Sequence, residues 1–301
     1  MVNDKRDKFD YEKNIMGLYK VDYLVAKSYH KFKMQMFLQS TKELAGRFLE
    51  IGCGAGVFSY NVSKYCPSFK IIAFDISRSA IKEAKLTINQ PIKWLVADGE
   101  CLPFQNNKFA VIALMDIVEH MPDISLLFKE CYRVIQNGGV LHGNIPCENN
   151  KYTIWWLMEK LKIGNKLTQK HLGHIQKLTT EELILALKQA GFEIKSIYYS
   201  RHLFGQLVTV FGFCIPKEIL VRLFGPNVSL GFTDYAINNK NNPIQHKPFT
   251  VRILILFQRI WYGLLRFLDI ISYYEILVLK RYRFMATDVH VTCVKRSVLY
   301  E

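Results

Sequence analysis

A glycine-rich turn beside a carboxylate is the first candidate for chemistry. Residues 50–56 read Glu-Ile-Gly-Cys-Gly-Ala-Gly and follow a short apolar run. Glycine lets the backbone turn sharply and approach a ligand closely, and a following helix offers unpaired N–H groups. Gly56 comes one residue too early for the G-x-G-x-x-G pattern of nicotinamide dehydrogenases. Glu50 would repel a pyrophosphate but would favour a positively charged sulfonium ligand, so the turn argues against NAD.

Three more carboxylates follow predicted strands further along the chain. Asp75 ends the run KIIAFD, Asp98 follows IKWLVA, and Asp116 follows FAVIALM. Because α/β sheets bind ligands at the carboxyl ends of their strands, this serial placement favours one shared site. Asp75 would accept hydrogen bonds from both hydroxyls of a ribose, and Asp98 would accept one from the exocyclic amine of adenine.

These segments resemble the successive motifs of class I S-adenosylmethionine-dependent methyltransferases. The resemblance rests on LEIGCGAG, AFDIS, VADGECLPF, FAVIALMDIVEHMPD and LFKECYRVIQNGGVLHGNIP, within residues 45–200. The best match is the type 11 group, which is similar to the ubiquinone- and menaquinone-biosynthesis methyltransferases. The resemblance implies S-adenosyl-L-methionine as cofactor and leaves the acceptor open.

The resemblance also implies which residues bind the cofactor. They are Glu50, Gly52, Gly54, Gly56, Asp75, Ile76, Asp98, Gly99, Asp116 and Ile117. The turn residues would surround the methionine part of the cofactor, and the residues after the second and third strands would hold the ribose and the adenine. The last pair would lie beside the methionine and the transferred methyl.

Two histidines are the candidate catalytic residues. A hydroxyl acceptor needs a base or a metal to lose its proton. His120 follows the fourth strand, and His174 lies in HLGHIQKLTTEEL. Related small-molecule methyltransferases place a histidine before a similar helix near the substrate mouth, and His174 matches that place better than His171. A structural hydrogen bond is the plain alternative for each histidine.

The sequence favours a site without a metal. Asp116-x-x-Glu119-His120 resembles a cluster that some quinone-ring O-methyltransferases use with a divalent ion, but its first position is Asp instead of Glu. Carboxylate–imidazole proximity alone does not choose an ion, so we expect no bound metal. Seven cysteines without a C-x-x-C pair also argue against a zinc cluster and indicate reduced thiols in a cytoplasmic protein.

The elements that must position these residues form an α/β pattern. Five apolar runs alternate with helical segments near 57–66, 78–88 and 123–136, and FEIKSIYYS and VHVTCVKR predict two further strands. The alternation predicts a Rossmann-like, doubly wound, mostly parallel sheet of seven strands. Thr179 or Thr180 is expected to cap a helix that ends before Gly191.

The pattern also predicts a division of the chain. Residues 1–46 are expected to form a helical N-terminal cover, and residues 47–200 the cofactor-binding core. Residues 201–285 are expected to form an apolar and basic helical insert, and residues 286–301 the final strand of the core. The insert would serve as a substrate lid or a membrane contact, with a dimer helix and a buried helix packed on the sheet as alternatives.

The charge of the chain bears on its partners. A net charge of +14 favours an anionic membrane surface or nucleic acid. Basic residues are spread along the chain and no appended RNA-binding motif is visible, so nucleic acid is less favoured. The sequence shows no apolar run typical of a signal peptide or a membrane span, so we expect a cytoplasmic protein with peripheral contact at the inner membrane face.

The leading function is methyl transfer to an oxygen of a small or lipid-like acceptor. Methylation of RNA or protein is the second hypothesis. A catalytically silent cofactor-binding protein that acts through its insert is the third. The oligomeric state stays open.

Overall fold

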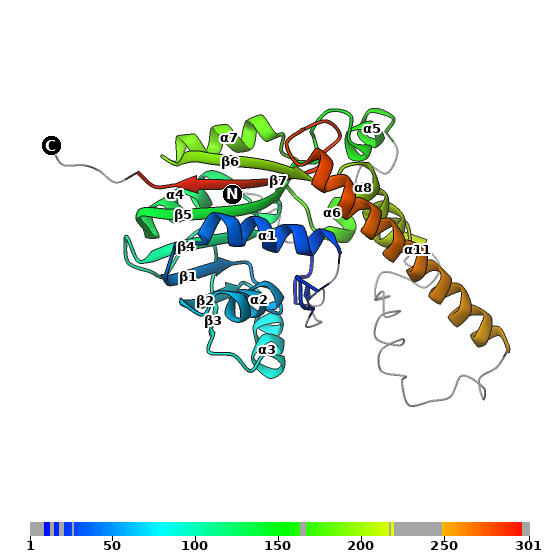
Figure 1. The fold of residues 1–301 in the computed structure, drawn as a ribbon, viewed down its shortest axis with the longest axis horizontal. Helices are drawn as coiled ribbons and strands as arrows, with labels where there is room; N and C mark the ends of the chain where they lie inside the picture. Colours follow the sequence, from blue (N-terminus) through cyan, green and yellow to red (C-terminus); the bar gives the residue numbers. More distant parts are fainter. Residues whose placement is uncertain are drawn as a thin grey trace.

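A computed structural model describes residues 9–12, 15–17, 21–25, 27–162, 167–216, 218–219 and 249–296. Its centre is one seven-stranded sheet in the order β3-β2-β1-β4-β5-β7-β6 (Figure 1). The strands are β1 (Gly46–Ile51), β2 (Phe69–Asp75), β3 (Lys93–Val96), β4 (Phe109–Met115), β5 (Ile135–Pro146), β6 (Glu193–Ser200) and β7 (Asp288–Val294). Strands β1 to β5 pair in parallel, and β7 runs antiparallel to β5 and β6. The predicted Rossmann-like, mostly parallel sheet is therefore confirmed.

Helices cover both faces of this sheet, as a doubly wound fold requires. They are α1 (Tyr29–Thr41), α2 (Val57–Tyr65), α3 (Arg78–Thr87), α4 (Ile124–Val134) and α7 (Thr180–Gln189). One apolar layer joins the sheet to α1, α2 and α3, and a second layer joins it to α4 and α7. Helix α7 begins with the predicted capping box, in which Thr179 and Glu182 bond to each other's backbone N–H groups.

The N-terminal part differs from the helical cover that the sequence predicts. Among the described residues of 1–46, the only helix is α1, which begins after the N-cap residue Ser28. Residues 21–25 instead form a turn held by Asp22, whose carboxylate accepts hydrogen bonds from Leu24 N and Tyr65 Oη. Hydrogen bonds of this stretch with Asn61 and Tyr65 of the core fix its path in place of helix packing.

A second group of helices lies at the carboxyl end of the sheet. It contains η2 (Val118–His120), α5 (Ile154–Lys160), α6 (Leu167–Leu172), α8 (Leu203–Thr209), η3 (Val210–Cys214) and α11 (Phe249–Leu279). Glu275 of α11 accepts hydrogen bonds from Leu203 N and Phe204 N at 3.1 Å and so caps α8. In Figure 1 the long helix α11 runs past α8 and its first turns project away from the sheet. None of the helices in the described part of the chain combines the length and apolar character that a membrane span needs.

Candidate active site

The turn between β1 and α2 has a backbone that only glycine adopts without strain. Gly52, Gly54 and Gly56 have φ of +71°, +53° and +84°. A Cβ atom on Gly52 would lie 2.5 Å from Cγ1 of Ile117, and one on Gly56 would lie 2.7 Å from Cζ3 of Trp94. The predicted glycine turn is therefore present, and Ile117 from the end of β4 packs directly against it.

Asp75 reaches this turn from the end of β2. Its Oδ2 accepts a hydrogen bond from Gly54 N at 2.8 Å, and its Oδ1 accepts one from Ser77 N at 2.9 Å. Burial raises the pKa of Asp75, although these N–H donors oppose the shift. The neighbouring Ile76 is 46% exposed, an apolar side chain left open to solvent at the strand end.

Glu50 lies inside the protein at the base of the turn. Its side chain is buried, and its Oε2 accepts a hydrogen bond from Ser59 Oγ of α2. Burial raises the pKa of Glu50 to about 8, against the opposing effect of the Ser59 hydrogen bonds. The carboxyl group therefore links the glycine turn to α2 through Ser59.

Asp98 and Gly99 follow β3 at the same edge of the sheet. Oδ1 of Asp98 accepts a hydrogen bond from Glu100 N at 3.0 Å. Gly99 is buried, and a Cβ atom on it would lie 3.3 Å from Ile51 and from Met121. The segment after β3 thus packs against the end of β1 and the residue that follows η2.

Asp116, after β4, is held by groups that the sequence did not single out. Its carboxylate pairs with the Lys33 ammonium of α1 and accepts a hydrogen bond from Asn144 Nδ2 of β5 at 2.6 Å. Burial opposes the charged form, but Lys33 and Arg201 outweigh it and hold the pKa of Asp116 well below its usual range. Lys33 is 4% exposed, and no local pattern marks it in the sequence.

The structure brings the two candidate histidines together. The ring centroids of His120 and His174 are 5.1 Å apart, and Nε2 of each ring lies 3.8 Å from Oε1 of the buried Glu119. His174 Nδ1 is 2.7 Å from Oε1 of Glu148, and His120 Nδ1 is 3.1 Å from the Gly173 carbonyl oxygen. Sequence reasoning missed Glu148, which has no motif of its own.

The same environment sets the protonation of these groups. Burial lowers the pKa of His120 to about 3 and raises that of Glu119 to about 8. Burial also disfavours a charged His174, but the carboxyl groups of Glu148 and Glu119 outweigh it and raise its pKa. The pair therefore offers one neutral imidazole and one with increased proton affinity, which suits proton transfer.

Residues 9–12 and 15–17 of the N-terminal part lie across these strand ends. The Met16 carbonyl oxygen accepts a hydrogen bond from Ala55 N at 2.8 Å, inside the glycine turn. Glu12 accepts from the backbone N–H groups of Arg78 and Ser79, at 2.8 and 2.9 Å, at the start of α3. Tyr11 Oη lies 3.3 Å from Nδ1 of His120. The sequence predicted a helix for this part of the chain, so it did not predict these contacts.

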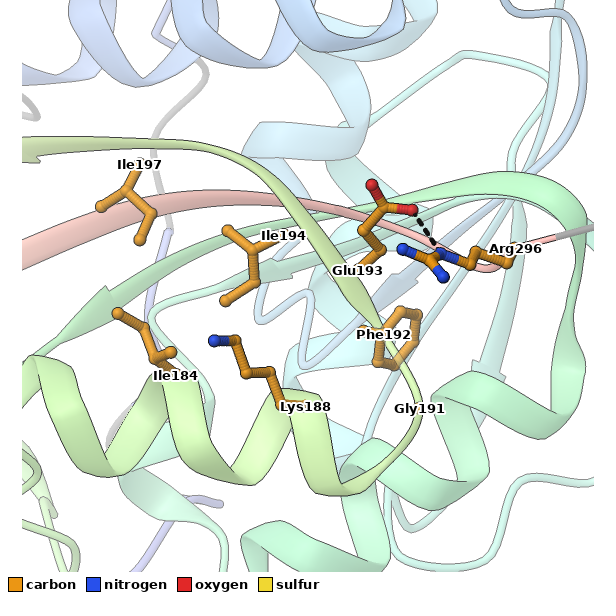
Figure 2. Close-up of a pocket in the computed structure, with 8 residues that line it drawn as sticks. All are labelled: Ile184, Lys188, Gly191, Phe192, Glu193, Ile194, Ile197 and Arg296. Atoms are coloured by element: carbon orange, nitrogen blue, oxygen red, sulfur yellow. Dashed lines mark hydrogen bonds and ion pairs between the residues drawn. The ribbon is translucent and has the colours of Figure 1, made fainter.

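A separate pocket of about 510 Å³ lies between α7 and β6 (Figure 2). Its apolar lining includes Ile184 and Ile197, and an ion pair of 2.8 Å joins Glu193 to Arg296 at one side. The pocket reaches the first residues of β6. Because β6 runs in the same direction as β5, these residues lie at the amino edge of the sheet, opposite the strand ends described above.

The residues at the strand ends fit an S-adenosylmethionine ligand. Glycines with positive φ form a cradle that a Cβ atom would fill, and carboxylates from β2 and β3 stand beside it. Such a set of N–H donors, carboxylates and exposed apolar carbon suits a zwitterion that carries a ribose and an adenine. The fold is the Rossmann-like fold of class I S-adenosylmethionine-dependent methyltransferases, and the residues at the strand ends fit that class.

Comparison with known proteins agrees with this class. Residues 49–142 match a family model described as a methyltransferase domain. A ubiquinone/menaquinone biosynthesis C-methyltransferase of Desulfotalea psychrophila is 31% identical over 96 residues, which are 32% of this chain and 39% of that protein. A ubiquinone biosynthesis O-methyltransferase of Coxiella burnetii is 26% identical over 152 residues, which are 50% of this chain and 64% of that protein. The chain thus spans 39% to 64% of the length of these two relatives.

A solved structure gives the same fold. Phosphoethanolamine N-methyltransferase 2 of Haemonchus contortus, solved with S-adenosyl-L-methionine, superposes with a TM-score of 0.55 at 15% identity, covering 97% of this chain and 60% of that one. At this identity the likeness concerns the fold alone. The matched segment makes S-adenosylmethionine the cofactor of the domain.

Proposed function

We propose that the protein transfers a methyl group from S-adenosylmethionine to an oxygen of a small, quinone-related or lipid-like acceptor. The observation that carries this proposal is the His120–His174 pair, in which His120 ends η2, shortly after β4 and Asp116, and His174 follows α6. A hydroxyl acceptor must lose a proton as it attacks the methyl carbon, and an imidazole of suitable pKa accepts it.

The remaining residues would position the reactants. The glycine turn and Asp75 would hold the amino-acid and ribose parts of the cofactor, and Asp98 with Gly99 would meet the adenine. Asp116 and Ile117 would lie beside the sulfonium. Because methyl transfer is an in-line substitution, alignment and exclusion of water supply much of the rate.

The relatives support a quinone-related acceptor without fixing the acceptor atom. One is named as a C-methyltransferase and the other as an O-methyltransferase. We favour oxygen because a phenolic hydroxyl makes direct use of the paired histidines. Carbon methylation of an activated ring is the nearest alternative.

Calorimetry followed by methyl transfer tests this proposal. The protein should bind S-adenosylmethionine and S-adenosylhomocysteine but not NADH, and Asp75→Ala should weaken both bindings. Transfer of a labelled methyl group should then be screened with catechols and prenylated phenols. His174→Gln should lose turnover while it retains cofactor binding, and His142→Gln, a buried histidine on β5, should leave turnover intact.

Two other outcomes have distinct signatures. A methyltransferase that acts on RNA would show binding that weakens steeply with salt, because counterions are released from the phosphates. A protein that binds the cofactor without turnover on any acceptor would have lost catalysis and would act through its C-terminal helices. Neither behaviour is expected of an enzyme with a small phenolic acceptor.

We also propose that α11, within the expected insert of residues 201–285, meets an anionic membrane surface. One face of the helix packs inward through Tyr273 and Ile276. An exposed apolar stripe at helical spacing lies elsewhere on it and consists of Ile260, Leu264, Phe267, Tyr274 and Val278. Exposed apolar side chains on a helix of a basic protein suit the interface of an anionic bilayer.

Vesicle flotation tests the membrane contact. The protein should float with phosphatidylglycerol vesicles and not with phosphatidylcholine vesicles, and Phe267→Glu should abolish flotation. Leu185→Glu, at a 56% exposed leucine on α7, is the matched control and should float like the parent protein. Equal flotation of both variants would contradict a contact through α11.

A further inference from the structure

Glu119 is a buried carboxyl group without a hydrogen-bond donor. Its side chain is 1% exposed, and neither Oε1 nor Oε2 has a hydrogen-bond partner among the residues that the structure describes. A carboxylate taken out of water without donors is strongly destabilised unless a cation stands beside it. The position therefore requires an explanation beyond packing.

Two imidazoles are turned toward this carboxyl group. Glu119 and His120 are neighbours on η2, and His174 arrives from the segment after α6. Oε1 of Glu119 lies 3.8 Å from Nε2 of each ring, too far for a hydrogen bond. All three ligand-type atoms lie within 4.8 Å of one another. The three atoms therefore face one another without a hydrogen bond between them.

The outer nitrogen of each ring is already engaged. Nδ1 of His174 is bonded to the Glu148 carboxylate at 2.7 Å, and Nδ1 of His120 to the Gly173 carbonyl oxygen at 3.1 Å. Because a carbonyl oxygen only accepts, His120 must donate from Nδ1, which leaves its Nε2 free to act as a ligand. A carboxylate or carbonyl behind the outer nitrogen is the arrangement that orients histidine ligands in metal centres.

We propose that Glu119, His120 and His174 form a binding site for a divalent transition-metal ion, with Glu148 orienting His174. Two imidazole nitrogens and one carboxylate suit Zn²⁺ or its neighbours, whereas Mg²⁺ and Ca²⁺ prefer oxygen ligands. Ligand bonds of about 2.0–2.2 Å require the three groups to close by less than about 1 Å. Three protein ligands leave at least one coordination position open.

This ligand set differs from the cluster that the sequence suggested. Asp116 is paired with Lys33 and bonded to Asn144, so its carboxylate takes no part. His174 takes its place, 58 residues further along the chain than Asp116. The expectation of a metal-free site was based on Asp116, Glu119 and His120 alone. It did not consider that His174 could lie beside Glu119 and His120.

The open coordination position also suggests a role for the ion in the reaction. This role rests on the proposed function. With the ion bound, both imidazoles are ligands, so the ion would replace them as the group that promotes deprotonation. A hydroxyl oxygen of the acceptor would take the open position, its pKa would fall, and its proton would pass to water. The binding of the ion itself does not depend on methyl transfer, so the two proposals can fail separately.

Metal titration of the full chain tests the site. Tag-free protein is stripped with a chelator and titrated with Zn²⁺ by calorimetry, and with Co²⁺ by visible absorption. We expect one ion for each chain, and a cobalt spectrum without a sulfur charge-transfer band, which separates this site from the seven cysteines. Glu119→Gln keeps the shape of the side chain and removes a buried charge, so the variant should fold.

The variants give the decisive comparison. Glu119→Gln and His174→Gln should each weaken Zn²⁺ binding at least about 100-fold, and Glu148→Gln about 10–100-fold. Asp116→Asn should bind Zn²⁺ as the parent protein does. No stoichiometric binding to the parent protein, or equal binding to folded Glu119→Gln, would overturn the proposal. Loss of binding in Asp116→Asn and Glu119→Gln, with binding retained in His174→Gln, would assign the ion to the sequence cluster instead.

Discussion

The glycine turn should tolerate no side chain at Gly56. Its φ of +84° lies in the left-handed region, where a residue with a Cβ atom costs about 1–3 kcal/mol. A Cβ atom would also lie 2.7 Å from Cζ3 of Trp94 and 3.0 Å from Cδ1 of Ile88. Trp94 is a 9% exposed, rigid side chain, so relieving this overlap costs about another 1–3 kcal/mol. Gly56→Ala should therefore lower the free energy of unfolding by about 2–6 kcal/mol.

Gly46→Ala serves to separate the cost of backbone strain from the cost of the steric overlap with Trp94. Gly46 also has a positive φ, of +112°, but the nearest atom to a Cβ there is Cβ of Ala110 at 3.6 Å, an ordinary contact. It should therefore show conformational strain alone. Trp94→Leu removes the ring that the new methyl would meet, so Gly56→Ala should cost about 1–3 kcal/mol less in that background.

Urea unfolding of the four variants, followed by far-ultraviolet circular dichroism, measures these differences. The reasoning fails if Gly56→Ala costs no more than Gly46→Ala. It fails equally if Trp94→Leu leaves the cost of Gly56→Ala unchanged. Either result would mean that the turn is not shaped by its contact with β3.

Three further predictions concern the charged groups around the site. Because the pKa of Glu50 is raised to about 8, the folded protein keeps a proton that the unfolded chain loses above about pH 4.5. The free energy of unfolding should therefore fall between about pH 4.5 and 8, by up to about 1.4 kcal/mol per pH unit. Urea titrations at several pH values should show that Glu50→Gln removes this part of the slope, whereas the exposed Glu43→Gln does not. Lys33→Met should cost about 1–3 kcal/mol of unfolding free energy in the same assay, because it leaves the Asp116 carboxylate without the ammonium group that pairs with it. The addition of Asp116→Asn should recover most of the loss; an equal loss in both would contradict the ion pair. Glu12→Ala frees the N-terminal segment from α3 and should speed its cleavage by trypsin without a change in melting temperature; cleavage at the parent rate would show that this bond does not hold the segment.

The sheet and the glycine turn could be predicted because their signals are local. Strands buried on both faces are continuous apolar runs, and a turn that needs positive φ demands glycine at fixed positions. The sequence also indicated both histidines, His120 and His174, although nothing in it measured the distance between them. Their pairing follows from the chain path after β5, which only the structure supplies.

The site residues that the sequence did not indicate contact residues far away in the chain. Lys33 meets Asp116 across 83 positions, and Glu148 meets His174 across 26. A buried lysine on α1 looks like any surface lysine until the helix is placed on the sheet. The helical prediction for residues 1–46 was wrong over residues 9–12, 15–17 and 21–25, because hydrogen bonds to the glycine turn, α2 and α3 determine the path there.

The bond between Met16 and Ala55 would couple residues 15–17 to the cofactor if the cofactor used the same N–H group. A ligand group that uses the same N–H group must first displace the Met16 carbonyl, and its measured affinity is then reduced by the fraction of molecules in which the segment is docked. Linkage is reciprocal, so such a ligand releases the segment to the same extent. A fusion tag or a deletion near residue 16 would then alter the cofactor's dissociation constant while every motif residue stays unchanged.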